Sequence, residues 1–266
     1  MLSRRGLCGV TPALLASVLC VSTGCSGLGS SSARASLGPT SIPTWEVIGK
    51  SREGLSIRAM SLGRPSARHS APRRVALIAG IHGDEREGGR HLDELLQRLT
   101  GYDGSIRIYE DVNPDGTWRG ARATSTGVDP NRNWPAQNFE PSPRQGSAPL
   151  SEPGVTAAYR DLVKFKPELV IVLHSTGHGP FVNFDGPAED YAQAFSDAAG
   201  PPWTVQPSMG YPTPGSFGSW MGVDNGIPTL TIEFRRGCPE AESQEALMAG
   251  MGAALALSLS RPIESD

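Results

Sequence analysis

Residues 76–89, ALIAGIHGDEREGG, contain the transition from a strand to a turn on which the interpretation of the whole chain depends. An apolar run stops at Gly80, and His82 and Glu85 follow, separated by two residues. The run is typical of a buried strand, and polar residues are common where a strand gives way to a helix. Imidazole and carboxylate groups are also zinc ligands. His-x-x-Glu alone favours a surface turn over a metal site, so the rest of the chain has to decide.

Apolar strands alternate with helical patterns on both sides of this segment. Strands are predicted at residues 44–51, 55–63, 73–81, 105–112, 167–175 and 227–234. Helices are predicted at residues 85–100, 151–166, 186–200 and 239–260. Glu85 is expected to start the first helix and Ser151 to cap the second. Residues 113–150, rich in Asn, Pro, Gly and Arg, are predicted to form a long functional loop. The alternation predicts a single α/β domain with a mixed, mostly parallel sheet and helices on both faces.

The composition is that of a globular protein rather than a nucleic-acid-binding one. The chain has 266 residues, 38% of them hydrophobic and 19% charged, and a formal net charge of −3. Three of the four cysteines lie within the first 25 residues, so Cys238 is the only one in the expected folded domain. One cysteine excludes both an internal disulfide and a zinc site built on several thiolates.

The N-terminus has the order of an export signal. Residues 1–24 contain positive charge, then a short apolar core, then small residues directly before Cys25. This resembles the lipobox of bacterial lipoproteins, which implies a lipid on Cys25; a twin-arginine or ordinary secretory signal is the alternative. Residues 25–43 are predicted to form a flexible tether and residues 44–262 the folded domain. We therefore expect an exported protein, lipid-anchored in the cell envelope or periplasm.

Three predicted strands end in residues that suit metal binding or proton transfer. His82, His174 and Glu233 stand at or near the carboxyl ends of separate strands, where parallel sheets collect their chemistry. A catalytic zinc takes three protein ligands and leaves one position open, and His82, Glu85 and His174 supply two imidazoles and a carboxylate. Glu233 lies in an otherwise apolar strand, where a carboxylate is costly unless it is paired or functional. It is the candidate base, with a structural salt bridge as the alternative.

The long loop carries three arginines within fourteen residues, Arg119, Arg122 and Arg132. They form either a solvated basic loop or a site for a substrate carboxylate, which a guanidinium binds with two hydrogen bonds. A second arginine could also stabilise the oxyanion of a tetrahedral intermediate.

Five motifs along the chain resemble, in their order, those of the zinc carboxypeptidase superfamily, the M14 metallopeptidases. They are HGDE at 82–85, NPDG at 113–116, GVDPNRNWP at 127–135, VLHS at 172–175 and TIEF at 231–234. The resemblance implies a zinc peptidase in which His82, Glu85 and His174 bind one Zn²⁺ per chain. It implies that Asn131 and Arg132 hold the terminal carboxylate of the substrate. It makes Glu233 the general base and acid, and an upstream arginine the group that polarises the scissile carbonyl.

Within this superfamily the chain resembles the murein peptide amidases, through APLSEPGVTAA at 148–158 and GYPTPGSFGSW at 210–220. That resemblance implies hydrolysis of the γ-D-glutamyl–diaminopimelate bond of peptidoglycan-derived peptides, with Tyr211 as a mobile residue that contacts substrate. Loop spacing favours Arg122 as the carbonyl-polarising residue, with Arg119 nearby. Pro130 stands where leucine is usual in the amidases. Asp185 and Asp224 are candidates for a contact to the second amino-acid head of diaminopimelate.

Three other functions remain open at this point. A zinc carboxypeptidase acting on ordinary peptides and an N-acyl amino-acid deacylase would share the fold and the zinc ligands. The alternative from another class is a lipid-anchored wall-binding protein with an inactive site. The presence of all three ligands and the base favours an enzyme. The composition gives no sign of a nucleic-acid partner, and the resemblance implies a peptidoglycan-derived peptide as substrate.

Overall fold

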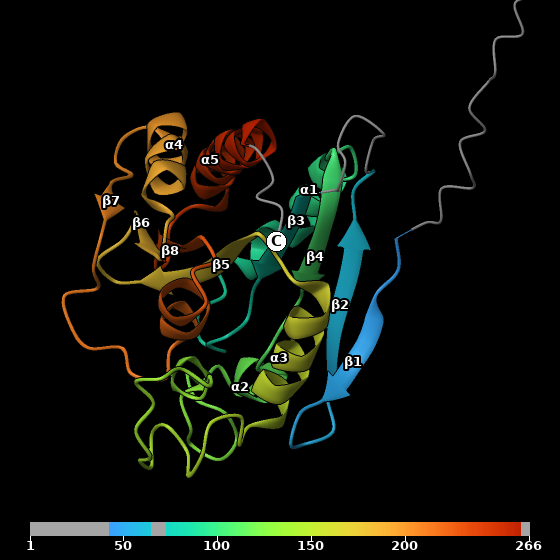
Figure 1. Cartoon of the computed structure of the whole chain (residues 1–266), viewed down its shortest axis with the longest axis vertical. Coiled ribbons are helices and arrows are strands. Elements are labelled where there is room, and N and C mark those ends of the chain that lie inside the picture. Colours follow the sequence, from blue (N-terminus) through green and yellow to red (C-terminus); the bar gives the residue numbers. More distant parts are fainter. Residues whose placement is uncertain (1–42, 65–72, 262–266) are drawn as a thin grey trace, which may run out of the picture. The chain divides into compact units, whose positions relative to one another are not determined.

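In the residues that the computed structural model describes, 43–64 and 73–261, eight strands form one sheet (Figure 1). The strands are β1 (Glu46–Lys50), β2 (Ser56–Leu62), β3 (Arg73–Ile78), β4 (Gly104–Tyr109), β5 (Leu169–Thr176), β6 (Phe181–Asp185), β7 (Val205–Gln206) and β8 (Thr229–Arg235). Their order across the sheet is β1-β2-β4-β3-β5-β8-β6-β7. The predicted signal, residues 1–24, and all but the last residue of the predicted tether lie outside the described residues.

The centre of the sheet is parallel and its outer strands introduce antiparallel pairs. β4, β3, β5 and β8 run parallel to one another, as do β6 and β7. β1 pairs with β2, β2 with β4, and β6 with β8 in antiparallel fashion. The predicted class, a mixed and mostly parallel sheet in one α/β domain, is confirmed.

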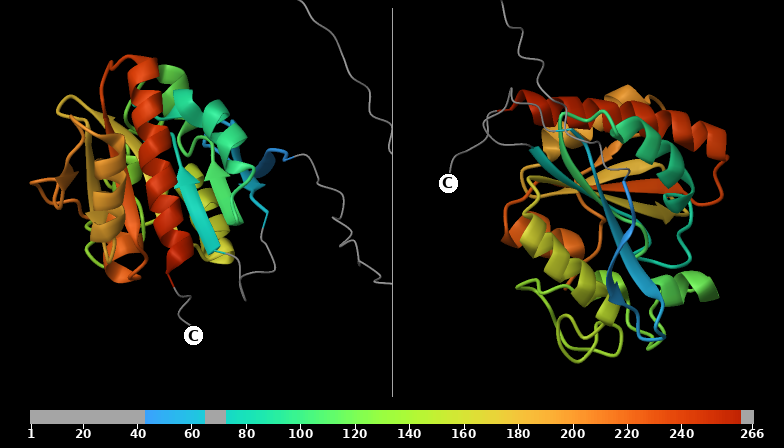
Figure 2. Two further views of the ribbon diagram at one scale, coloured as in Figure 1. Left: turned by 90° about the horizontal axis from the view of Figure 1, so that it is seen from above. Right: turned by 90° about the vertical axis from the view of Figure 1, so that its right-hand side faces the viewer.

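Helices cover both faces of the sheet (Figure 2). They are α1 (Leu92–Leu99), α2 (Pro114–Arg119), α3 (Pro153–Phe165), α4 (Glu189–Ala199) and α5 (Glu240–Ser260), with the short helices η1 (Gly89–His91), η2 (Pro130–Arg132) and the π-helix η3 (Ser219–Asp224). α1, α4 and α5 pack on one face, and α3 and η3 pack on the other. Among the described residues, no helix is long and apolar enough to span a lipid bilayer.

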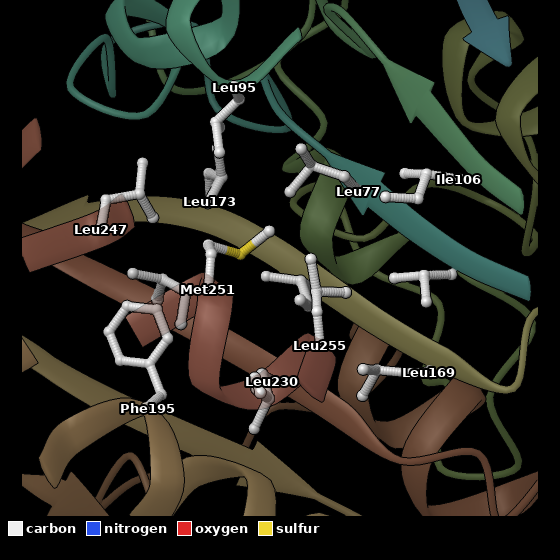
Figure 3. Packing of buried hydrophobic residues seen from close by; sticks show 14 of the residues in the cluster. Leu77, Leu95, Ile106, Leu169, Leu173, Phe195, Leu230, Leu247, Met251 and Leu255 are labelled. Atoms are coloured by element: carbon white, nitrogen blue, oxygen red, sulfur yellow. The ribbon is translucent and has the colours of Figure 1, made fainter. Parts of the chain in front are cut away.

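The apolar strands bury side chains on both faces, which is why their sequences read as continuous hydrophobic runs. Figure 3 shows the face beneath α5, where Leu77 of β3 and Leu173 of β5 lie close to Leu95 of α1 and Met251 of α5. Ile78 and Val172 face the opposite way, in the cluster that contains α3. The central strands are thereby held between two hydrophobic layers, so that their carboxyl ends form a rigid edge.

Two predicted helix starts are wrong. The first helix was expected from residue 85, but α1 begins at Leu92 after the short helix η1. The second begins at Pro153 with Glu152 as its N-cap, and no side chain caps it. The hydroxyl of Ser151 instead accepts a hydrogen bond from Asn133 Nδ2 at 2.9 Å. A tertiary contact therefore uses the side chain that local sequence assigned to the cap.

The sequence interpretation also missed regular structure. β6 and β7 were not expected, because FVNFD at 181–185 is short and contains polar residues. The predicted loop 113–150 contains α2 and η2, and Asn113 caps α2 by accepting a hydrogen bond from the Gly116 backbone at 3.1 Å.

Candidate active site

The three predicted metal ligands converge at the carboxyl ends of β3 and β5. His82 Nδ1 lies 2.9 Å from Glu85 Oε1 and 3.1 Å from His174 Nδ1, and His174 Nδ1 lies 2.7 Å from Glu85 Oε2. All three residues are buried, and one ligand atom from each lies within 4.8 Å of the others. Adjacent parallel strands β3 and β5 bring together residues that are 92 positions apart in the chain.

A tight turn aims His82 and Glu85 at the same point. The Glu85 backbone N–H donates to the His82 carbonyl at 3.2 Å, so Glu85 belongs to the turn and does not start the helix as expected. Gly83 is needed for a close approach: a Cβ there would lie 2.1 Å from the backbone of Gly116 in α2. Asp84, to which the sequence assigned no role, forms an ion pair with Arg236 at 3.3 Å.

The donor set fits a single divalent cation. Two imidazole nitrogens and a carboxylate are the mixed ligands of catalytic zinc, and their mutual separations of about 3 Å suit ligands that share one ion. Burial alone would raise the pKa of the Glu85 carboxyl, but His174 and His82 outweigh burial and hold that pKa well below its usual range. Glu85 is therefore a carboxylate, the form that binds metal.

Asp129 is a site residue that the sequence interpretation missed. Its Oδ1 lies 3.0 Å from His82 Nε2, so it orients the imidazole and leaves Nδ1 for the metal. It also accepts a hydrogen bond from the Asn131 backbone at 2.9 Å and so caps η2. The available signal was the Asp-Pro pair in GVDPNRN, a typical start of a short helix.

Asn131 and Arg132 lie on η2 beside the ligands. Asn131 Nδ2 is 3.4 Å from His174 Nε2, and its Oδ1 accepts a hydrogen bond from the Phe217 backbone at 2.9 Å. Arg132 is 6% exposed, and Nη1 donates to the Asn131 carbonyl at 2.6 Å. Within the described part of the chain, no carboxylate forms an ion pair with Arg132. A buried guanidinium that feels the charge of Asp129 but forms no direct ion pair is well suited to bind a carboxylate from outside the chain.

Glu233 comes from β8, the next strand of the sheet. It stands opposite His174 in the parallel pairing of β5 with β8. Burial raises the pKa of the Glu233 carboxyl, although His174 opposes this effect. A buried carboxyl beside a metal site, with a raised pKa, is suited to accept and return a proton.

The structure separates the two candidate arginines. Arg122 donates to Glu85 Oε1 at 2.8 Å and to Asp129 Oδ2 at 3.2 Å, and it lines the cavity. Arg119 instead contacts Glu53 in the turn between β1 and β2 and does not line the cavity. Arg119 therefore lies outside the cavity, and its contact with substrate stays a prediction.

The ligands line a cavity of about 370 Å³, and the remaining predicted residues differ in whether they reach it. Tyr211 lies at its rim and is 53% exposed. Asp185 also lines the cavity, but Asp224 does not, because its Oδ2 accepts a hydrogen bond from the Gln137 backbone at 2.7 Å. The cavity therefore contains the three ligands, Glu233, Arg122, Asn131, Arg132 and Tyr211.

Residues 39–242 match the model of the zinc carboxypeptidase family Peptidase_M14. The chain belongs to this family. Members of the family are zinc-dependent peptidases, so the predicted enzyme class, a metallocarboxypeptidase-type hydrolase, is confirmed along with the family.

Among curated proteins, this zinc carboxypeptidase family member is similar to murein peptide amidases. It is 33% identical over 191 residues to murein peptide amidase A of Escherichia coli K12, which covers 64% of this chain and 73% of the relative. It is 28% identical over 178 residues to the Vibrio campbellii protein of the same name, covering 60% and 69% of the two chains.

Solved structures show the same fold. The crystal structure of murein-tripeptide amidase from Escherichia coli O157 matches with a TM-score of 0.63 at 28% identity, over 84% of this chain and 94% of that one. Bovine thrombin-activatable fibrinolysis inhibitor matches with a TM-score of 0.67 at 18% identity, over 82% and 91% of the chains, which is a likeness of fold alone.

Proposed function

We propose that this protein is a zinc-dependent amidase that hydrolyses the γ-D-glutamyl–diaminopimelate bond of peptidoglycan-derived peptides. The observation that carries the proposal is the guanidinium of Arg132, which is buried and forms no direct ion pair, in the same cavity as the ligand cluster and Glu233. This arrangement suits a substrate whose free carboxylate lies one residue from the bond to be cut. Two relatives are named murein peptide amidases, which supports the choice of peptide.

His82, Glu85 and His174 would hold the zinc ion, with Asp129 fixing the ring of His82. When bound, zinc supplies the Lewis-acid chemistry that allows water to attack an amide carbonyl near neutral pH. Glu233 takes a proton from the attacking water and passes it to the nitrogen of the leaving amine.

The arginines bind the substrate carboxylate and stabilise the charge that develops on the carbonyl oxygen. Arg132, with Asn131, binds the α-carboxylate of the leaving residue and so fixes the distance from that carboxylate to the scissile carbonyl. Arg122 places a cation next to Glu85, where negative charge develops on the carbonyl oxygen. Tyr211, half-exposed at the rim, closes over bound substrate.

The acyl side of the proposed substrate has a distinctive charge. A γ-linked D-glutamyl residue keeps its own α-carboxylate free, so this substrate has one more carboxylate near the scissile bond than an ordinary peptide. The cavity offers a third guanidinium, that of Arg236, 3.7 Å from Glu85. Arg236 is also paired with Asp84, and its position in the cavity supports a γ-D-glutamyl substrate over an N-acyl amino acid with a neutral acyl group.

Hydrolysis of defined peptides by the soluble domain tests the proposal. L-Ala-γ-D-Glu-diaminopimelate, an α-linked L-peptide with a free C-terminus and an acyl-aspartate would be compared, with and without a chelator. We expect cleavage of the first substrate to exceed the others in kcat/KM and to stop on chelation. Preference for the α-linked peptide would make the protein an ordinary carboxypeptidase, and preference for acyl-aspartate would make it a deacylase. A zinc-free protein inert toward all three would point to the wall-binding alternative.

We also propose that the protein is exported and anchored through a lipid on Cys25, although the signal and this cysteine lie outside the described residues. The support is the order of charge, apolar core and small residues in the sequence. Labelled palmitate should enter the full chain in bacterial cells and should not enter the Cys25→Ser variant. Equal labelling of both, or release of unlabelled protein to the medium, would contradict the anchor.

A further inference from the structure

Glu87 is a buried carboxylate, 4% exposed, to which the proposed mechanism gives no role. It lies two residues beyond the metal ligand Glu85, and its two oxygens accept hydrogen bonds from two other segments. Oε2 accepts from the hydroxyl of Ser175 at the end of β5, at 2.6 Å. Oε1 accepts from the backbone N–H of Gly237, in the turn between β8 and α5, at 2.9 Å. One side chain therefore joins the segment of the metal ligands to the ends of two strands.

The segment that carries Glu87 packs closely on β5. A Cβ added to Gly88 would lie 2.5 Å from Leu173 Cβ, so the glycine allows Glu87 to come within reach of the strand end. The ion pair of Glu87 with Arg90, at 3.6 Å, lies within its own segment and involves a guanidinium that is 40% exposed, so water screens it. A buried carboxylate needs compensation, and the hydrogen bonds from the other two segments therefore supply most of it.

The turn that Glu87 holds is the one that places Arg236 in the cavity. The backbone N–H of Arg236 donates to the Thr176 carbonyl at 2.8 Å, and the next backbone N–H, that of Gly237, donates to Glu87. Gly237 has a φ of +74°, a left-handed conformation that glycine adopts at little cost. Two successive hydrogen bonds therefore fix the backbone from which the Arg236 side chain extends.

The Arg236 guanidinium retains donors for a ligand. Nη1 donates to Asp84 Oδ2 at 3.3 Å and Nη2 to the Ser175 carbonyl at 3.5 Å, whereas a guanidinium has five N–H donors. In the proposed function Arg132 binds the carboxylate of the leaving residue, so Arg236 is available for a carboxylate on the acyl side. An arginine side chain is long and has many rotamers, so a displaced backbone would misplace the guanidinium.

We propose that Glu87 is a positioning residue, which holds the turn after β8 so that Arg236 can bind the carboxylate on the acyl side of the substrate. Glu87 does not line the cavity and acts through the backbone of Gly237. The inference rests on the proposed function for the identity of that carboxylate as the free α-carboxylate of a γ-linked D-glutamyl residue. The link between Glu87 and the turn depends only on the hydrogen bonds described above.

The test compares two substrates that differ only in this carboxylate. One is L-Ala-γ-D-Glu-diaminopimelate, and in the other the α-carboxylate of the D-glutamyl residue is a carboxamide. kcat and KM would be measured on both for wild type, Glu87→Asp, Glu87→Gln and Arg236→Gln.

Each variant has a matched control. Arg235→Gln removes the neighbouring charge, which is exposed and lies outside the cavity, and so controls for Arg236→Gln. Glu94→Asp shortens a carboxylate in an exposed ion pair of α1 and so controls for Glu87→Asp. Zinc content and urea denaturation of each variant confirm that it is folded and loaded.

Wild type and both controls should prefer the carboxylate substrate over the carboxamide by about 10-fold in kcat/KM, the low end for a hydrogen bond to a charged group, because Arg236 is 45% exposed. Arg236→Gln should lose this preference, mainly through a higher KM for the carboxylate substrate. Glu87→Asp should lose it too, since its shorter side chain keeps the charge but cannot reach both partners.

Glu87→Gln separates geometry from charge. It keeps the length of the side chain, an acceptor for the Gly237 N–H and a donor for the Ser175 hydroxyl, so it should retain most of the preference. A merely structural role of Glu87 would lower kcat/KM on both substrates by the same factor in Glu87→Asp and leave the preference intact. That result, or a wild type that does not discriminate between the substrates, would overturn the assignment.

Two further measurements keep the inference independent of turnover and of the proposed function. In calorimetry the acyl product L-Ala-D-Glu should bind wild type more tightly than its α-carboxamide, and Glu87→Asp should bind the two equally; a difference that persists in Glu87→Asp would count against the role of Glu87. If the enzyme cleaves α-linked but not γ-D-glutamyl substrates, the proposed function fails. α-Linked peptides whose acyl-side residue is glutamate or glutamine then measure the preference for a carboxylate, and its loss or retention in Glu87→Asp still decides the role of Glu87.

Discussion

His82 is held at both ring nitrogens, and the two contacts have different consequences. Nδ1 faces Glu85 and His174, whereas Nε2 lies 3.0 Å from Asp129. Burial alone would raise the pKa of Asp129, but its hydrogen bond to His82 and the charges around it hold that pKa well below the usual range. An ionised Asp129 fixes the tautomer of His82 and increases its basicity toward a metal.

Asp129→Asn should therefore weaken zinc binding about 10–100-fold, the usual effect of losing such a supporting carboxylate. Competition with a chromophoric chelator measures the affinity. Asp197→Asn, an exposed carboxylate on α4, is the control and should bind zinc like wild type. Unchanged affinity in Asp129→Asn would show that η2 orients His82 without help from this carboxylate.

Glu233 differs from Glu85 in its surroundings, although both are buried. Burial raises the pKa of Glu233, whereas two imidazoles lower that of Glu85. One carboxyl is therefore suited to proton transfer and the other to metal binding.

Glu233→Gln should retain zinc and lower kcat by about 10²–10⁴-fold, because a general base typically contributes this much. Zinc content by elemental analysis and kcat for a cleaved peptide are the two measurements. A variant that keeps zinc and turns over at the normal rate would remove Glu233 from the mechanism.

At the scale of elements, α4 and α5 approach closely at Gly250. A Cβ added to Gly250 of α5 would lie 2.7 Å from ring atoms of Phe195 in α4. Phe195 belongs to the hydrophobic layer on the α5 face of the sheet, and Gly250 lies directly against Phe195. The absence of a side chain at Gly250 therefore allows the two helices to pack on β8 and β5 together.

Gly250→Ala should lower the free energy of unfolding by about 1–3 kcal/mol, the usual cost of overpacking a core. Urea denaturation measures the change. Gly252→Ala is the matched control, because no atom lies within 4 Å of a Cβ there. The control should stabilise by up to about 1 kcal/mol through helix propensity. If both variants are equally stabilised, the approach at Gly250 is looser than the structure indicates.

At the scale of the whole molecule, the order of strands creates the site. β3, β5 and β8 are neighbours at the centre of the sheet, although their site residues are spread over positions 82 to 233. β6, which runs antiparallel to β8, adds Asn183 and Asp185 to the lining of the cavity. Unfolding of the sheet separates all of these groups. The protonation of a single buried carboxyl therefore affects the free energy of unfolding of the whole domain.

Asp111, just after β4, provides a test of that coupling. Burial raises the pKa of its carboxyl from 3.8 to about 6. Between these values the folded protein holds a proton that the unfolded chain has lost, so the contribution of Asp111 to stability falls as pH rises from about 4 to above 6. Asp111→Asn keeps an oxygen for the hydrogen bond from the Asn113 backbone.

The variant should therefore gain stability relative to wild type as pH rises from 4.5 to 7.5. Urea denaturation of both zinc-loaded proteins at the two pH values gives the difference, and groups common to both proteins cancel. A stability difference that is the same at both pH values would show that Asp111 titrates normally.

Much of the site could be predicted from the sequence because its chemistry is local. His82, His174 and Glu233 each follow or end an apolar run, and parallel strands place such ends at one edge. Asp129 could not be recognised in the same way, because its role depends on a contact to His82 across 47 positions. Ser151 was assigned to a helix cap for the same reason: its partner Asn133 lies in another segment.

The sequence by itself determined the alternation of strands and helices, and with it the fold class, the family and the residue types of the metal site, because periodicity and short motifs are properties of adjacent residues. Only the tertiary structure decided that Arg122 rather than Arg119 enters the cavity and that Asp185 rather than Asp224 lines it. It also decided that Arg132 is buried without a direct ion pair. These outcomes depend on which side chains meet when distant segments pack, and burial then sets the energy of each unpaired charge.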